Sequence, residues 1–115
     1  MGLRLRRLAA AASVPLGILF LASAGAAARV PAHPSKVAII VIDKLTFGPS
    51  PTGLHAGDTL EWVNRDIFRH SATGKGFDLD LKPGAKGRLV LKGAGIVPYY
   101  CRYHPSMKAQ FTIEP

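Results

Sequence analysis

Near its C-terminal end the chain reads Val97-Pro98-Tyr99-Tyr100-Cys101-Arg102-Tyr103-His104-Pro105-Ser106-Met107. A thiol, an imidazole and a thioether follow one another here at three-residue spacing, in Cys101, His104 and Met107. Cys101 is the only cysteine of the 115 residues, so an internal disulfide is impossible. Sulfur ligands combined with imidazole select soft metal ions, copper above all. A lone cysteine is also common as an inert core residue, but that interpretation leaves the spacing of His104 and Met107 unexplained.

Three ligands from one loop need a fourth from another part of the chain. His70 is the best candidate, because it begins a predicted strand. His33 lies in a proline-containing lead and His55 beside a turn, and both are interpreted as ordinary surface residues. Met107 has the alternative role of a core residue, since methionine commonly packs. A Cys–His₂ plane with a weak axial Met is the arrangement of blue copper sites, and the hypothesis is such a site at His70, Cys101, His104 and Met107.

The first 28 residues have the order of a secretory signal peptide. Three arginines near the start are followed by an uncharged run, residues 8–28, that ends in small residues. This order predicts export with cleavage after Ala28, and Ala24 and Ala26 are competing positions. An uncleaved membrane anchor is the other interpretation, because about 20 apolar residues span a bilayer. Pro15 and the alanine-rich tail favour cleavage.

The predicted organisation is a signal peptide at residues 1–28, an N-terminal lead at 29–35 and one domain at 36–115. Cleavage removes three arginines and lowers the net charge from +8 to about +5. A basic surface can steer a protein toward an acidic partner, and Arg102 and Lys108 are candidates to contact one. A solvated basic face without a special partner is the other interpretation. Nucleic acid is not expected as a partner, because an exported chain without interleaved aromatic and basic residues is not typical of nucleic-acid binding. A domain this small is often reinforced by a metal.

Short apolar segments separated by glycine and proline turns recur along the domain. Strands every 8–12 residues, with no convincing helix after the signal peptide, predict an all-β antiparallel sandwich or barrel. The first strand is apolar on both faces, which predicts that it is covered on both sides or lies at an edge beside the lead. The predicted strands are 36–43, 59–64, 70–73, 77–81 and 88–91, followed by segments around 97–101 and 107–113.

Two stretches of the chain resemble the cupredoxin family of blue copper proteins. They are Gly57-Asp58-Thr59-Leu60-Glu61-Trp62-Val63-Asn64-Arg65-Asp66, followed by His70, and the segment from Tyr99 to Met107. Within the family they are similar to the plastocyanin and amicyanin type. The resemblance covers residues 36–113. It implies a Greek-key β-sandwich, one type-1 copper ion and electron transfer, with the ligands His70, Cys101, His104 and Met107.

The resemblance also implies contacts beside the ligands. Many family members carry Asn directly after the first ligand histidine, where it bonds to the cysteine loop. Ser71 takes that place here, and its hydroxyl is expected to do part of the same work. Pro105 is expected to stiffen the loop by fixing φ beside His104. The residues expected next to the ligands are Asn64, Ser71 and Pro105, and those expected in an apolar patch around a near-surface His104 are Pro49, Phe68 and Pro105.

These features predict a periplasmic copper protein that carries single electrons between redox partners by Cu(I)/Cu(II) cycling. A copper-binding or copper-delivery protein of the same fold is the alternative. An enzyme is not expected, since no paired carboxylates, nucleophile–base pair or open coordination position is evident. Zinc also binds Cys and His, but the thioether favours copper. The protein is expected to be a monomer with a redox-protein partner and no stable membrane insertion after cleavage.

Overall fold

The computed structural model describes residues 2, 10–23, 25 and 33–115. The chain divides into two units, Met1–Val30 and Pro31–Pro115. The described residues of the first unit form neither helix nor strand. No helix within the described part of the chain has the length and apolar character needed to cross a membrane. The predicted cleavage after Ala28 lies outside the described residues, so export and the boundaries 1–28, 29–35 and 36–115 stay predictions.

The second unit is built from strands, and its described residues contain no helix. The predicted strands 59–64 and 77–81 are confirmed to the residue, whereas the strand predicted at 88–91 begins two residues earlier. The strands are β1 Val37–Asp43, β2 Thr46–Phe47, β3 Leu54–His55, β4 Thr59–Asn64, β5 His70–Gly74, β6 Phe77–Leu81, β7 Lys86–Val90, β8 Gly95–Tyr100 and β9 Lys108–Glu114.

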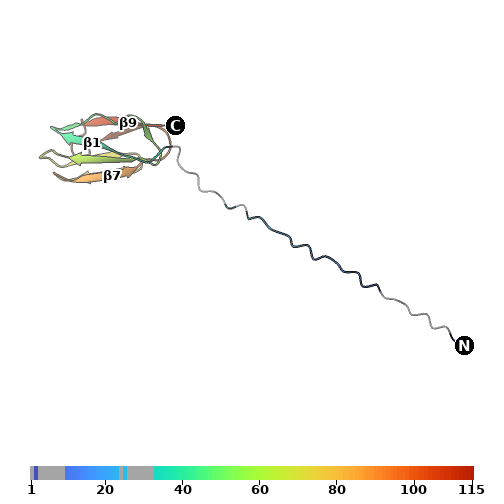
Figure 1. The fold of residues 1–115 in the computed structure, drawn as a ribbon. Coiled ribbons are helices and arrows are strands. Elements are labelled where there is room, and N and C mark those ends of the chain that lie inside the picture. The colour runs from blue at the N-terminus through green and yellow to red at the C-terminus, as the bar shows by residue number, and fades with distance from the viewer. Residues whose placement is uncertain (1, 3–9, 24, 26–32) are drawn as a thin grey trace. The chain divides into compact units, whose positions relative to one another are not determined.

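The strands form two sheets, in the orders β2-β1-β4-β7 and β3-β9-β8-β5-β6. Figure 1 shows β1 and β7 in one layer and β9 in the other. The predicted all-β sandwich is therefore confirmed. Most pairs are antiparallel, but β1 pairs with β4 and β3 with β9 in parallel. Parallel neighbours need a long connection between them. The segment from β1 to β4 provides one, since it passes through β2 in the first sheet and β3 in the second.

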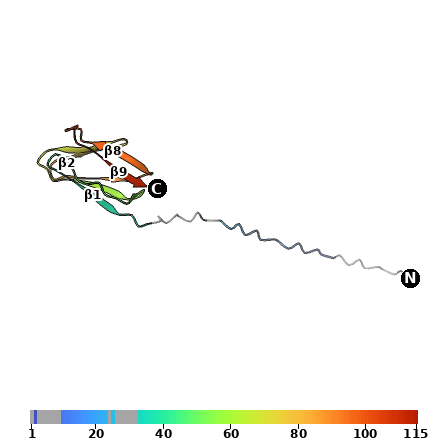
Figure 2. The ribbon, with the colours of Figure 1, turned by 90° about the horizontal axis from the view of Figure 1, so that it is seen from above.

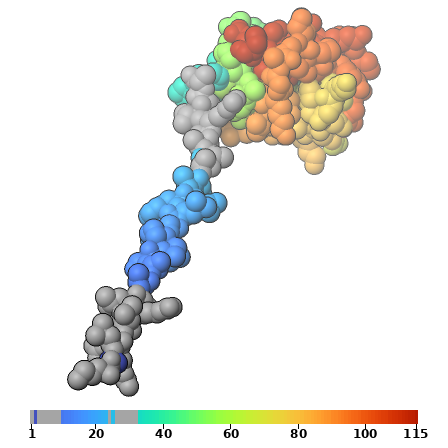
Figure 3. Space-filling model, turned by 90° about the vertical axis from the view of Figure 1, so that its right-hand side faces the viewer, coloured from blue at the N-terminus to red at the C-terminus, as the bar shows by residue number. Residues whose placement is uncertain are grey.

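The core lies between the sheets. Trp62 on β4 is completely buried, and its ring packs edge-on against Tyr99 at 5.3 Å and Phe111 at 6.0 Å between centroids. Each aliphatic or aromatic side chain that leaves water on folding contributes about 1.5–3 kcal/mol. Segments that are far apart in the sequence, coloured green, orange and red, pack against one another in Figure 3. The buried cluster comprises Ile40, Ile42, Phe47, Leu54, Leu60, Trp62, Ala72, Leu81, Leu91, Tyr99, Cys101, Met107, Phe111 and Ile113.

Strand β1 departs from its predicted environment. Ile40 is fully buried, but Val37 and Ile39 on the opposite face are 51% and 54% exposed. The strand is therefore not covered on both sides by the residues that the structure describes. It lies inside its sheet between β2 and β4, although the short β2 pairs only with the last two residues of β1. Apolar residues on the outer face reflect β propensity here rather than burial.

The start of β5, the end of β8 and the start of β9 lie at one end of the second unit. Strand β5 begins at His70 and pairs antiparallel with β8, which places Thr73 opposite Tyr100. Strands β8 and β9 lie side by side in Figure 2 and form a hairpin in which Tyr100 pairs with Lys108. The seven residues between them form a loop at the tip of this hairpin. The topology therefore brings residue 70 and the loop 101–107 to the same place.

Candidate metal centre

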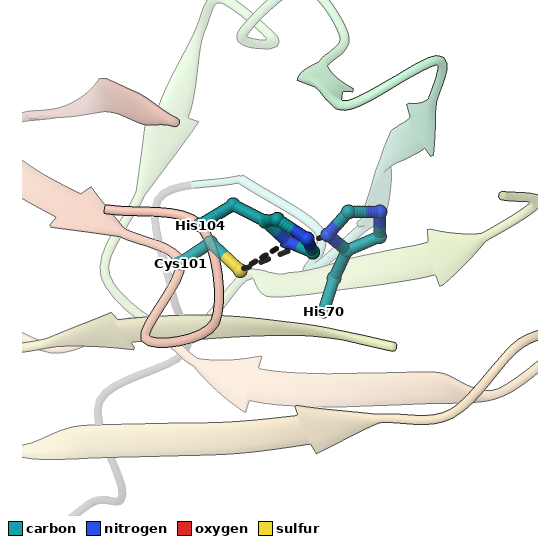
Figure 4. Close-up of side chains that lie close together, drawn as sticks. All are labelled: His70, Cys101 and His104. Carbon is teal, nitrogen blue, oxygen red and sulfur yellow. Dashed lines mark hydrogen bonds between the residues drawn. The ribbon is translucent and has the colours of Figure 1, made fainter. Parts of the chain in front are cut away.

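Cys101, His70 and His104 converge at this end of the sandwich. The Cys101 Sγ lies 3.7 Å from His70 Nδ1 and 3.8 Å from His104 Nδ1. The two imidazole rings are 5.0 Å apart between centroids and inclined by 55°. Figure 4 shows both rings directed at the sulfur, His70 from its strand and the other two residues from the loop. One donor atom from each residue lies within 4.8 Å of the others, so the three side chains can hold one metal ion.

The spacing of the donor atoms fits one bound metal ion. With metal–sulfur and metal–nitrogen bonds of about 2.3 and 2.05 Å, an angle of 120° separates sulfur from nitrogen by about 3.8 Å. A tetrahedral angle with the same bonds gives about 3.6 Å. The observed separations of 3.7 and 3.8 Å are compatible with one metal ion in either geometry, so the choice of ion depends on the chemistry of the ligands. A His₂Cys trigonal plane is characteristic of blue copper sites, whereas structural zinc sites are tetrahedral.

The site is shielded from water except at one ligand. Cys101 and His70 are completely buried, and His104 is partly exposed. The Cys101 sulfur accepts one hydrogen bond, from the Ser71 amide at 3.4 Å. A buried polar group is costly unless it is partnered. A buried thiol that faces one buried and one partly exposed imidazole therefore indicates a metal site rather than ordinary core packing.

The loop is closed by its own backbone. The Cys101 amide donates to the Met107 carbonyl at 3.0 Å, and the Met107 amide donates to the His104 carbonyl at 2.8 Å. These bonds place Met107 directly behind the cysteine, where its side chain is 6% exposed and belongs to the same buried cluster as Cys101. Core packing and a weak axial contact to a metal are compatible with this position, because the thioether is flexible and soft.

A carboxylate holds the outer nitrogen of His70. Asp66 Oδ2 lies 2.9 Å from His70 Nε2, a contact that the sequence analysis did not include. The same oxygen accepts the Leu45 amide in the β1–β2 turn, and Oδ1 accepts the Ile67 amide. The hydrogen bond from the Leu45 amide, and to a smaller extent that from the His70 ring, lowers the pKa of Asp66 to about 2. An ionised carboxylate can only accept, so Nε2 carries the proton and the Nδ1 lone pair is directed at Cys101.

Asn64 supports this carboxylate rather than a ligand. Its side-chain amide donates to the carbonyls of Phe68 and Leu81, and its carbonyl accepts the Asp66 amide at 2.9 Å. These three bonds fix the link between β4 and β5, from which Asp66 reaches His70. A sequence signal for this contact exists, because a ligand histidine usually donates its second ring N–H to a carboxylate, a backbone carbonyl or water, and Asp66 lies only four residues before His70.

Ser71 connects the histidine strand to the cysteine loop. Its amide donates to the Cys101 sulfur, and its hydroxyl accepts the Arg102 amide at 2.8 Å. A second bond joins the hydroxyl to Thr73 Oγ1. The serine thus makes a cross-loop contact of the kind that the resemblance assigns to asparagine at this position.

Charged side chains anchor the loop from outside. Arg102 Nε donates to Asp78 Oδ1 at 2.8 Å, and Tyr103 donates to Asp80 at 3.1 Å. Arg69 also binds Asp80, and the guanidinium carbons of Arg69 and Arg102 lie 5.4 and 5.1 Å from the centre of the Tyr103 ring. The arginine that sequence analysis directed at a partner is therefore paired within the chain.

Phe68 lies beside the partly exposed ligand. Its ring meets that of His104 edge-on at 6.0 Å between centroids, and it is 46% exposed. Its neighbour Ile67 is 81% exposed. Pro49 and Pro105, the other residues expected in this patch, are exposed, but neither contributes to the hydrogen bonds and ring contacts described around His104.

No family model matches this sequence. Solved structures similar to it include a reduced tryptophan-to-tyrosine mutant of amicyanin, with 23% identity and a TM-score of 0.61 over 68% of this chain and 82% of that one. A proline-to-glycine mutant of amicyanin, in the reduced Cu(I) form at pH 4, has 27% identity and a TM-score of 0.58 over the same shares. A purple cupredoxin from Nitrosopumilus maritimus has 22% identity and a TM-score of 0.62 over 67% of this chain and 99% of its own. With its two sheets and their order, this protein has a cupredoxin-like fold.

Proposed function

We propose that the protein binds one type-1 copper ion and carries single electrons between redox partners. The observation that supports this most directly is the pair of distances, 3.7 and 3.8 Å, from the buried Cys101 sulfur to two histidine Nδ1 atoms. Cys101, His70 and His104 form the plane of ligands, and Met107 is the axial ligand. Bound copper supplies the one-electron Cu(I)/Cu(II) couple. Amicyanin, whose fold is similar, has been solved in a Cu(I) form.

The residues around the site favour electron transfer because they restrict the motion of the proposed copper ligands. The sulfur is held by the Ser71 amide, His70 by Asp66, and the loop by its backbone bonds to Met107. Ligands held in one geometry need little rearrangement when the charge on the metal changes, and such preorganisation lowers the barrier to reaction. His104 is the partly exposed ligand and touches Phe68, so its ring edge is the proposed route for electrons.

The proposed setting is the periplasm, with a redox protein as the partner. The N-terminal order of arginines, apolar run and small residues supports export. The net charge of +8 for the chain, or about +5 without residues 1–28, supports an acidic partner surface. The four proposed ligands fill the copper site and leave no position for a substrate, so the proposed role is not that of an enzyme.

Copper loading tests the proposal. Purified protein given one equivalent of Cu(II) is expected to turn intensely coloured, from thiolate-to-copper charge transfer, and to bleach and recover on reduction and reoxidation. Cys101→Ser is expected to lose the band while keeping its far-ultraviolet circular dichroism. Ser106→Ala, an exposed change in the same loop, is the matched control and should keep the colour. Colourless copper-loaded wild-type protein would exclude a type-1 site.

A second measurement separates carriage from delivery. An electron carrier is expected to exchange electrons rapidly between its Cu(I) and Cu(II) forms and to retain copper against a competing chelator. Loss of Cu(I) to an acceptor faster than electron exchange would favour the delivery function.

A further inference from the structure

A second group of metal-ligand residues lies away from the proposed copper site. His33, His55 and Asp58 each offer a donor atom within 4.8 Å of the others. His55 ends β3 and pairs with Glu114 at the end of β9, whereas Met107 directly precedes β9. At about 3.4 Å per residue, the length of β9 separates the two groups by roughly 20 Å. The second group is therefore independent of the first.

In both histidines Nε2 is the ring nitrogen whose lone pair is available to bind a metal ion. His33 Nδ1 lies 3.2 Å from the Pro34 carbonyl oxygen, and His55 Nδ1 lies 3.1 Å from the Gly53 carbonyl oxygen. A carbonyl only accepts, so each Nδ1 carries the proton and each Nε2 keeps a lone pair. Metal-bound histidines usually have this arrangement, in which a backbone carbonyl fixes the tautomer. The two rings are 4.1 Å apart between centroids, so one ion can reach both.

Two carboxylates complete the group. Asp58 is fully buried, and its oxygens accept the amides of Lys36 at 3.0 Å and His55 at 2.9 Å, one bond each. A carboxylate has about four acceptor positions, so a lone pair remains on each oxygen. Glu114 Oε2 lies 3.7 Å from His55 Nε2 on the more exposed side. A surface hollow of about 440 Å³, lined by both histidines and Glu114, gives an ion access.

We propose that His33 and His55 bind one divalent transition-metal ion, Zn(II) or Cu(II), with oxygen from Asp58 and Glu114. Two imidazoles and carboxylate oxygens suit these ions, and the absence of sulfur from this donor set makes it a poor site for Cu(I). The bound ion links the segment before β1 to β3 and β9. The chain thus holds two metal sites of different softness, one for redox copper and one for a divalent ion. This inference does not depend on the proposed electron-carrier function.

The test follows the histidine rings themselves. Zn(II) alone, titrated into the purified protein, is expected to shift the ring-proton resonances of His33 and His55 at micromolar concentration, and a chelator should reverse the shifts. His55→Asn is expected to weaken the response of His33 at least tenfold, and Glu114→Gln to weaken it less. His104→Asn is the matched control at the other site and should leave the His33 and His55 shifts unchanged.

Binding of Cu(II) provides a second test of the same proposal. Wild-type protein is expected to hold two equivalents, and His33→Asn and His55→Asn one each. Electron paramagnetic resonance should show the second equivalent as a signal with wide copper hyperfine splitting and no thiolate character, also in Cys101→Ser. Rings that stay unshifted at micromolar Zn(II), or a second equivalent that survives both histidine substitutions, would overturn the proposal. Failure of the thiolate band in wild-type protein would count only against the electron-carrier function.

Discussion

Asp66 Oδ2 lies 2.9 Å from His70 Nε2, on the side of the ring opposite the Cys101 sulfur. The imidazole is therefore held between a carboxylate and a thiol. The carboxylate is itself fixed by the amides of Leu45 and Ile67, so it cannot swing away when the charge at the other side of the ring changes. A carboxylate bonded to a ligand histidine makes that ligand a stronger donor.

Removal of the Asp66 charge is expected to raise the reduction potential. The charge stabilises Cu(II) more than Cu(I), and a unit charge about 7 Å away, in an effective dielectric constant near 20, changes the potential by on the order of 100 mV. Asp66→Asn, measured by voltammetry of the copper-loaded protein, tests this. Asp43→Asn removes an equal charge from an exposed position and should shift the potential much less. Equal shifts of the potential in both variants would mean that Asp66 acts only through the net charge of the protein.

Loss of the Ser71 hydroxyl is expected to weaken the fold more than the colour. Ser71→Ala leaves the Arg102 amide without its acceptor, which costs about 1–3 kcal/mol of unfolding free energy. The hydrogen bond from the backbone amide of residue 71 to the Cys101 sulfur persists, so the charge-transfer band should remain. Urea unfolding of the metal-free protein measures the first effect and the visible spectrum the second. A variant as stable as the wild type would show that water replaces the hydroxyl.

Tyr103 is expected to stabilise the ligand loop mainly through its ring. Tyr103→Phe keeps the two arginine contacts, whereas Tyr103→Ala loses them, and each exposed cation–π contact contributes about 0.5–1 kcal/mol. Thermal unfolding should therefore rank the variants wild type, Phe, Ala. Electron self-exchange should slow in the Ala variant, because a looser loop rearranges more. If Phe were as damaging as Ala, the hydroxyl bond to Asp80 would be the main contribution.

Stability is expected to fall in acid through Asp78 and Asp80. The side chain of Arg102 lowers the pKa of Asp78, and that of Arg69 lowers the pKa of Asp80. A carboxyl whose folded pKa lies below its unfolded value of 3.8 stabilises the protein above that value, and the contribution is lost as pH falls through the folded pKa. Denaturant unfolding of metal-free protein between pH 6 and about pH 2 measures this loss. Asp80→Asn should flatten the curve below pH 4.

Neighbouring isoleucines of β1 are expected to differ sharply in their contribution to stability. Ile40 is fully buried, so Ile40→Ala should cost about 2–5 kcal/mol of unfolding free energy. Ile39 is 54% exposed on the other face, and Ile39→Ala should stay within roughly 1 kcal/mol. Urea unfolding of both variants checks the register of this strand against β4. Equal losses would mean that the outer face of β1 is also covered.

The sequence alone determined the class of fold and the residues of the loop. Alternating apolar residues place Leu60 and Trp62 on one face because successive side chains of a strand point in opposite directions. The spacing of Cys101, His104 and Met107 predicts a metal site because few other functions require these three side chains together. Both inferences use interactions between residues close in the sequence, and periodicity and motifs record such interactions.

Only the tertiary structure decided which distant groups meet. The anchoring of Arg102 and Tyr103 on β6 and the approach of His33 to His55 depend on how segments from different parts of the chain lie together. From the sequence alone, Arg102 is expected to face an acidic partner and both His33 and His55 to be ordinary surface residues, since nothing within a few positions of them indicates otherwise. Long-range contacts are set by the packing of two sheets around one core, and a linear pattern does not contain that arrangement.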